Sequence, residues 1–156
     1  MRILLGSSGS GFGSDEKIVM ETSIDDMNPQ IYEYVTELLF AAGAQDVYIT
    51  PVYMKKSRPG IKLEALLDEA LKEKIASIIF RETTTSGIRF YKVRRLKLDR
   101  HIKKIHTRFG RIKVKYNRGP GNIESISPEY EDCKRVASRL KVPLKAVLDE
   151  AKRSAA

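Results

Sequence analysis

Two hydrophobic periodicities alternate along residues 17–99, and their order limits the folds that the chain can adopt. Apolar side chains recur with the 3.6-residue period of a helix in residues 31–42 and in residues 68–80. Four short runs of strand type lie around these two segments: 17–20, 46–54, 61–67 and 88–99. The order β-α-β-β-α-β is that of the ferredoxin-like plan, an antiparallel four-stranded sheet with two helices on one face. We therefore predict an α+β fold with a ferredoxin-like domain at residues 17–100.

Residues 101–156 predict a second, small α+β domain. Two strand-like runs, 101–107 and 111–116, flank a short turn, and their alternation is typical of a β-hairpin. A short strand at 123–126 follows, and then two helices, of which the last begins after Pro143. The hairpin is rich in Lys and Arg, so we predict a basic domain.

Capping residues indicate where the helices begin and end. Asn28 is the expected N-cap of the first helix, with Pro29 at its first position. By the same argument, Ser127 and Pro128 begin the first helix of the second domain. Gly43 is expected to close the first helix as its C-terminal cap residue.

The N-terminal sequence has the composition of a tether. Residues 6–14 read G-S-S-G-S-G-F-G-S, which is typical of a flexible linker, and we assign residues 1–16 to a flexible segment. No apolar run approaches the roughly 18 residues of a membrane-spanning helix, and Ile3-Leu4-Leu5 is too short for a signal-peptide core. The single cysteine, Cys133, excludes an internal disulfide and is expected to be buried. These features predict a cytoplasmic protein without a membrane partner.

The formal net charge of +9 is concentrated in the second domain. Residues 1–100 carry 15 Lys and Arg against 14 Asp and Glu, whereas residues 101–156 carry 14 against 6. This surplus implies a polyanionic partner: nucleotide phosphates, nucleic acid or an acidic protein. Phe109 and Tyr116 alone are a weak base-stacking platform, so nucleic acid is not the expected partner.

Three polar loops of the first domain, Glu21–Asn28, Lys55–Gly60 and Arg81–Arg89, are candidate binding segments. The first contains Asp25 and Asp26, whose hard oxygen atoms suit Mg²⁺ or Mn²⁺. The other two offer cations and hydroxyls that bind phosphate oxygens: Lys55, Lys56, Arg58, Arg81, Thr83, Thr84, Thr85 and Arg89. Acidic groups for a divalent cation beside basic groups for phosphates are the parts of a metal–nucleotide site.

Each of these loops also has a purely structural explanation. The aspartate pair can complement a helix dipole, the lysine pair can be a solvated turn, and the threonines can form a turn before a strand. No Walker A, H-E-x-x-H, C-x-x-C or G-x-S-x-G motif is present, so no catalytic residue is assigned. His101 and His106 fall on opposite faces of one predicted strand and are not expected to bind a metal together.

Four motifs of the chain resemble the C-terminal half of the LarC family of nickel-insertion proteins, over residues 17–153. The motifs are E-T-S-I-D-D-M-N-P-Q-I-Y-E-Y, A-G-A-Q-D-V-Y-I-T-P-V-Y-M-K-K-S-R-P-G, R-E-T-T-T-S-G-I-R and S-P-E-Y-E-D-C-K-R-V-A. Members of this family are chelatases that insert nickel into a pyridinium bis-thiocarboxylate mononucleotide, the precursor of the nickel-pincer cofactor.

The resemblance implies a lyase-type insertion reaction that depends on CTP. It also implies that this half binds CTP with Mg²⁺ or Mn²⁺ and forms a homo-oligomer, a trimer or a hexamer. Pro51 in residues 46–54 indicates an edge strand or a bulge, and an open edge strand is consistent with such an assembly. Carried onto this chain, the resemblance implies that Asp25 and Asp26 hold the divalent ion. The triphosphate would then meet the cations of the two basic loops: Lys55, Lys56, Arg58, Arg81 and Arg89.

The family's N-terminal half and its His-rich, nickel-handling stretch do not occur in this sequence. We therefore expect no chelatase activity from the chain alone, and we expect this half to be a separate polypeptide or a lost segment. The competing interpretation is a small-molecule-sensing module of a transcription regulator, since ferredoxin-like domains serve many functions. Against it, the last two helices show no convincing helix-turn-helix.

Overall fold

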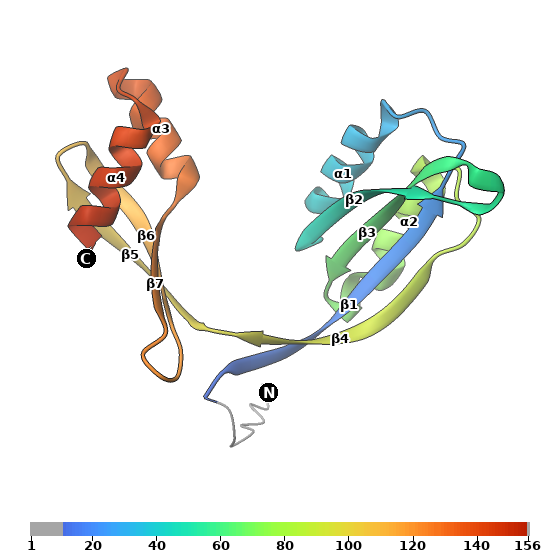
Figure 1. Ribbon diagram of the computed structural model, residues 1–156, viewed down its shortest axis with the longest axis horizontal. Helices are drawn as coiled ribbons and strands as arrows, with labels where there is room; N and C mark the ends of the chain where they lie inside the picture. The colour runs from blue at the N-terminus through green and yellow to red at the C-terminus, as the bar shows by residue number, and fades with distance from the viewer. Residues whose placement is uncertain (1–10, 156) are drawn as a thin grey trace. The chain divides into compact units, whose positions relative to one another are not determined.

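The computed structural model describes residues 11–155 of the chain (Figure 1). They divide into two compact units: Ser14–Arg95 form one, and residues 96–155 together with residues 11–13 form the other. Of the expected flexible segment, residues 1–10 lie outside the described residues, and from Gly13 onward the chain is part of a strand. No helix in the described part of the chain is long and apolar enough to span a membrane.

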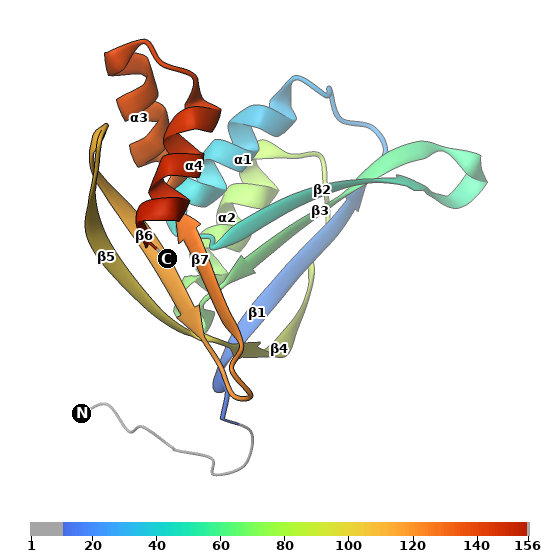
Figure 2. The same cartoon turned by 60° about the vertical axis from the view of Figure 1, so that its left-hand side comes forward.

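The first unit is a four-stranded sheet covered by two helices. Its elements are β1 (Gly13–Ile24), α1 (Ile31–Ala42), β2 (Asp46–Tyr53), β3 (Pro59–Leu67), α2 (Lys72–Glu82) and β4 (Arg89–Lys97). The strand order is β2-β3-β1-β4, and β3 pairs antiparallel with both β1 and β2. Figure 2 shows α1 and α2 on the same face of this sheet. This is the predicted ferredoxin-like arrangement, so the α+β fold class is confirmed, and Pro51 lies in an edge strand as expected.

Strand β1 is longer than the predicted strand at residues 17–20. Its inward residues Ile18, Met20 and Ile24 are buried and alternate with outward ones. The polar residues 21–23, which the sequence placed in a loop, pair with β3 as far as Ile24 opposite Ile61. Backbone pairing in a central strand thus outweighs the local polarity of the side chains.

The helices supply the other half of this core. Buried side chains of α1 and α2 pack against β1 and β3: Val35, Leu39, Ala42, Ile75, Ile78 and Ile79. Gly43 closes α1 as predicted, with φ of 110° and with the Ala44 N–H donating to the carbonyl oxygen of Leu39. The predicted start of α1 is wrong: the helix begins at Ile31 with Gln30 as its N-cap, and Asn28 and Pro29 precede it. The preceding turn is closed by the Ile31 N–H, which donates to the carbonyl oxygen of Asn28.

The second unit is a three-stranded antiparallel sheet packed against two helices. Its elements are β5 (Asp99–Thr107), β6 (Gly110–Arg118), β7 (Glu124–Pro128), α3 (Tyr130–Leu140) and α4 (Leu144–Ala155). The predicted hairpin is present as β5 and β6, with Thr107 paired to Gly110. Ile112 of β6 contacts the buried face of α3 and α4, which includes Cys133, Val136, Ala137, Val147 and Ala151.

The predicted start of α3 is wrong. Ser127 and Pro128 are the last residues of β7, Glu129 is the N-cap, and the helix begins at Tyr130. Pro128 is tolerated there because β7 is the edge of the sheet, where a missing N–H breaks no ladder. The pairing continues one residue further, since the Glu129 N–H donates to the carbonyl oxygen of Lys113 at 2.8 Å.

Candidate functional site

The three polar loops meet at the end of the first sheet where β1 finishes. Asp25, just after β1, forms an ion pair with Arg58 from the β2–β3 connection, at 3.3 Å between Oδ2 and a guanidinium nitrogen. The next residue, Asp26, accepts a hydrogen bond from the hydroxyl of Thr84 in the α2–β4 connection, at 2.5 Å. The two adjacent carboxylates therefore link one cationic loop and one hydroxyl loop.

An open cleft of about 390 Å³ lies beside these contacts. It is lined by β1, the α2–β4 connection and the first residue of β4: Thr22, Ser23, Thr85, Ser86, Gly87, Ile88 and Arg89. Hydroxyls, a backbone turn and one guanidinium group are hydrogen-bonding partners of the kind that phosphate oxygens take.

Thr22 fixes the wall of this cleft. Its side chain is only 2% exposed and occupies an inward position of β1, between Met20 and Ile24. Its hydroxyl lies 2.6 Å from the hydroxyl of Thr85, and both hydroxyls are within hydrogen-bond distance of the Gly87 carbonyl oxygen, at 2.9 and 3.0 Å. A buried hydroxyl must find such partners, so Thr22 holds the 85–87 turn against the sheet.

Arg89 supplies the charge in the cleft. Its Nε lies 3.1 Å from a carboxylate oxygen of Glu21, and another of its nitrogens donates to the Ser23 hydroxyl at 3.5 Å. The Arg89 side chain is still 67% exposed, which leaves guanidinium nitrogens facing solvent. Glu21 also lies 3.8 Å from Lys62, whose pKa is raised by its hydrogen bond to Glu64 and by these neighbouring carboxylates. Arg89 is therefore oriented by Glu21 without being buried.

The loop that carries Arg58 has a strained backbone. Lys56 and Ser57 have φ of 60° and 55°, values that residues other than glycine rarely adopt. The Met54 N–H donates to the carbonyl oxygen of Arg58 at 2.8 Å and closes the turn. Gly60 then packs so closely that a Cβ atom there would lie 2.6 Å from the Ile24 carbonyl oxygen and 3.3 Å from the Cα of Asp25. The glycine lets this turn approach the aspartates.

Several of the predicted site residues are not among those that line the cleft. Lys55 and Lys56 are exposed in the 55–57 turn. Arg81 belongs to the last turn of α2, where it pairs with Glu82 at 2.7 Å. The Thr83 hydroxyl caps that helix by donating to the carbonyl oxygen of Ile79 at 2.7 Å. Of the nucleotide-binding residues predicted from sequence, Thr85 and Arg89 line the cleft, and Arg58 and Thr84 contact the aspartates.

The side chains that could act as ligands limit how a metal ion can be bound. Within residues 11–155 no group of three His, Cys, Asp or Glu side chains is placed to hold an ion. A protein-only cage is thus not formed by the described residues. The aspartate pair does fit the usual Mg²⁺ arrangement, in which one or two carboxylates act together with water and substrate phosphates. The charge of Asp26 also reaches α1, because burial and then this carboxylate raise the pKa of Tyr32.

Thr22 and Ser23 lie in the candidate segment Glu21–Asn28 but were not assigned a role of their own, although one sequence signal identifies the first. Thr22 is a polar residue at an inward position of an otherwise apolar alternation, Ile18, Met20 and Ile24. A hydroxyl at such a position predicts a buried hydrogen bond to another segment. Ser23 carries no comparable signal, because outward positions of a strand are commonly polar.

These features define a class of protein: an α+β protein with a ferredoxin-like unit and a separate basic unit. The sheet of the ferredoxin-like unit carries at one end a cleft lined by hydroxyls and a guanidinium group. The family model described as nickel insertion protein matches residues 1–148 of the chain. The chain therefore belongs to the nickel insertion protein family, as the four motifs predicted, and the alternative of a transcription-regulator module gains no support.

Curated relatives agree with this assignment. The pyridinium-3,5-bisthiocarboxylic acid mononucleotide nickel insertion protein of Acetivibrio thermocellus is 49% identical over 150 residues, which are 96% of this chain and 37% of that protein. The protein of the same name from Clostridium acetobutylicum is 44% identical over 147 residues, 94% of this chain and 35% of that protein. The chain thus spans little more than a third of the length of these relatives.

Solved structures agree as well. The structure described as LarC2, the C-terminal domain of a cyclometallase involved in the synthesis of the NPN cofactor of lactate racemase, in its apo form, superposes with a TM-score of 0.85 and 34% identity. The match covers 92% of this chain and 99% of that one. A protein of Methanopyrus kandleri shares the fold at 18% identity, with a TM-score of 0.67 over 90% of this chain and 89% of that one.

Proposed function

We propose that this chain is the CTP- and metal-binding part of a nickel insertion protein, which places nickel, as substrate, into pyridinium-3,5-bisthiocarboxylic acid mononucleotide. The observation that carries the proposal is the meeting of the Asp25–Asp26 pair with Arg58 and Thr84, beside a cleft that contains Arg89. In a member of this family, carboxylates next to guanidinium and hydroxyl groups provide the elements of a metal–nucleotide site.

The residues of the site have distinct parts in the proposed binding step. Asp25 and Asp26 would hold Mg²⁺ or Mn²⁺ together with phosphate oxygens of CTP, and the ion would neutralise the negative charge of those phosphates. Arg58 is paired with Asp25 through a single contact and is otherwise exposed, so its guanidinium group can turn to a phosphate when the ion takes the carboxylate. Arg89 binds a second phosphate oxygen while Glu21 keeps it oriented. Lys55 and Lys56 add positive charge in the turn that precedes Arg58.

The partners follow from the length of the chain and from the exposed edge of its sheet. Because the chain spans 37% of the Acetivibrio relative, we propose that the remaining part of the family's protein, on the same or a separate polypeptide, supplies the nickel ligands. We also propose a cytoplasmic homo-oligomer, a trimer or a hexamer. The exposed apolar residues of β2, Tyr48, Ile49 and Tyr53, are candidates for its contacts.

The test is a calorimetric titration of the purified chain with CTP in the presence and absence of Mn²⁺. We expect Mn²⁺-dependent binding, and we expect the paired substitution Asp25→Asn and Asp26→Asn to remove the metal dependence while the circular dichroism spectrum stays unchanged. Asp46→Asn, at a half-buried aspartate where the edge strand β2 begins, is the control and should bind like the parent. If the double variant still binds CTP with the same metal dependence, the two aspartates are only structural and the proposed site is misplaced.

A further inference from the structure

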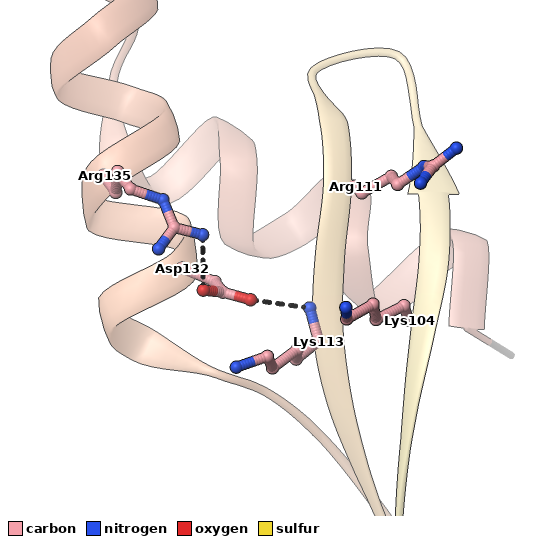
Figure 3. A pocket seen from close by; sticks show the side chains of 5 residues that line it. All are labelled: Lys104, Arg111, Lys113, Asp132 and Arg135. Atoms are coloured by element: carbon pink, nitrogen blue, oxygen red, sulfur yellow. Dashed lines mark hydrogen bonds and ion pairs between the residues drawn. The ribbon is translucent and has the colours of Figure 1, made fainter.

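The second unit contains a basic pocket that the candidate site does not include. It has a volume of about 200 Å³ and lies where the β5–β6 hairpin meets α3. Figure 3 shows its five lining residues: Lys104, Arg111, Lys113, Asp132 and Arg135. Four cations against one carboxylate give it a formal charge of +3. It shares no residue with the cleft of the first unit.

The hairpin places three of these cations on one face. Lys104 lies directly opposite Lys113 in the β5–β6 pairing, and Arg111 is two residues from Lys113 along β6. Like charges that face each other across strands destabilise a sheet. Within residues 11–155, the side chains of Lys104 and Arg111 form no ion pair with a carboxylate of the chain. These cations leave a surplus of positive charge at the pocket, and such a surplus attracts anions.

Asp132 organises the pocket without neutralising it. Its side chain is buried, with 6% exposure; Oδ2 accepts the Lys113 N–H at 3.0 Å and Oδ1 accepts a nitrogen of Arg135 at 2.6 Å (Figure 3). Burial opposes ionisation of Asp132, but these two hydrogen bonds lower its pKa below the ordinary value of 3.8, so it remains a carboxylate. Because both of its oxygens are engaged, the carboxylate fixes Arg135 and leaves the side chains of Lys104, Arg111 and Lys113 available to an anion.

The shortness of β7 explains why Asp132 is there. β7 ends at Pro128, opposite Val114, so the next N–H along that edge of β6, that of Lys113, has no partner in β7. The first turn of α3 covers this end of β6, and Asp132 accepts the N–H that the sheet leaves unpaired. The pocket is therefore built by the fold and does not depend on flexible surface lysines alone.

We propose that this pocket binds a phosphate monoester, the terminal phosphate of a small phosphorylated molecule such as a mononucleotide. A monoester carries close to two negative charges at neutral pH and presents three oxygens to several donors at once. The volume is below the roughly 300–1,000 Å³ of pockets that enclose a whole drug-sized ligand, so it suits a phosphate group with the rest of the molecule outside. The proposal does not rest on the proposed CTP function, because the pocket belongs to the other unit.

The experiment titrates the full chain with ribose 5-phosphate, followed by calorimetry and by ³¹P line broadening. Lys104→Gln and Arg111→Gln should each weaken binding about tenfold or more, the effect of losing one hydrogen bond to a charged group. The matched control is Lys103→Gln, which removes the same charge from the neighbouring residue. The ammonium group of Lys103 lies over the ring of Tyr116, away from the pocket, and this change should weaken binding less than about twofold.

The outcomes separate the possible ligands. Binding of inorganic phosphate in a manner that also requires Lys104 and Arg111 supports the pocket and shows that the sugar is not needed. Equal losses in all three variants would mean diffuse attraction to a basic surface and would overturn the proposal. It is overturned equally by absence of ribose 5-phosphate binding at millimolar concentration. A DNA oligonucleotide that binds more tightly than ribose 5-phosphate at physiological salt would assign the surface to nucleic acid instead.

Discussion

Thr22 can be tested at the scale of a single hydroxyl. Thr22→Val keeps the shape of the side chain but removes the hydroxyl that contacts Thr85 and the Gly87 carbonyl, which retain only their contact with each other. We expect a loss of about 1–3 kcal/mol in the free energy of unfolding, measured by urea denaturation, and weaker CTP binding because the 85–87 turn is released. Thr22→Ser retains the hydroxyl and should recover most of both. Equal behaviour of the valine and serine variants would show that the hydroxyl does not anchor the cleft.

Asp132 gives a pH prediction with a defined sign. Its folded-state pKa is lowered from 3.8, so the stability that it contributes is present above the unfolded-state value and is lost as pH falls through the lower folded value. The amide proton of Lys113, which donates to this carboxylate, should report the titration in NMR spectra. We expect its midpoint below 3.8. The titration should vanish in Asp132→Asn, and a midpoint at or above the ordinary value would contradict the hydrogen-bonded arrangement.

Cys133 illustrates a simpler residue-scale expectation. The thiol is fully buried in the core of the second unit, and burial, together with the charges of Asp132 and Glu129, raises its pKa above 9.0. Both effects disfavour the thiolate, the reactive form. Thiol reagents at pH about 8 should therefore label the folded chain slowly and the urea-unfolded chain fast. Rapid labelling of the folded chain would indicate that the second unit opens readily.

Among the elements, the 55–60 connection depends most on one position. A Cβ atom on Gly60 would approach the Ile24 carbonyl oxygen to 2.6 Å and the sulfur of Met54 to 2.7 Å. Gly60→Ala should push the turn that carries Arg58 away from Asp25. We expect it to cost about 1–3 kcal/mol of stability and to weaken metal-dependent CTP binding. Gly87→Ala is the control for stability, since a Cβ there meets no atom within 4 Å. An equal cost for both variants in urea denaturation would contradict the steric argument.

Helices and strands with a strong hydrophobic period were predictable, whereas several of their ends depended on hydrogen bonds in turns and between strands. The apolar face of α1 and the glycine at residue 43 were enough to predict that helix and its C-terminal end from local sequence. Asn28 and Pro128 have the chemistry of helix-start residues, but neither begins a helix. Asn28 takes part in a turn before α1, and Pro128 pairs in the ladder between β6 and β7. The family followed from the motifs, while the cleft required the fold, because Thr22 and Thr85 are 63 residues apart in the chain.

At the scale of the whole molecule, the free edge of β2 motivates a prediction about assembly. Tyr53 is 88% exposed there, and Tyr48 and Ile49 are also exposed large hydrophobic residues. An exposed apolar edge strand is a pairing surface unless it is covered. Sedimentation velocity should therefore show a trimer or hexamer, and Ile49→Lys should dissociate it. Tyr130→Lys, at an aromatic residue of α3 that is 53% exposed against 41% for Ile49, should leave the assembly intact. A strict monomer for the parent at micromolar concentration would contradict this assignment.

The two compact units also predict two independent anion sites. Arg89→Ala or Arg58→Ala, in the first unit, should each cost about 1.5–3 kcal/mol of CTP binding, the range for a hydrogen bond to a charged group. The same substitutions should leave ribose 5-phosphate binding unchanged. Conversely, the double variant Lys104→Gln with Arg111→Gln should abolish ribose 5-phosphate binding. It should leave CTP binding within about twofold of the parent, because substitutions at sites without shared partners have independent effects. Calorimetric titration of each variant with each ligand decides the matter. Loss of CTP affinity in the variant with both Lys104→Gln and Arg111→Gln would mean that the basic unit belongs to the nucleotide site. The net charge of +9 would then attract one ligand instead of two.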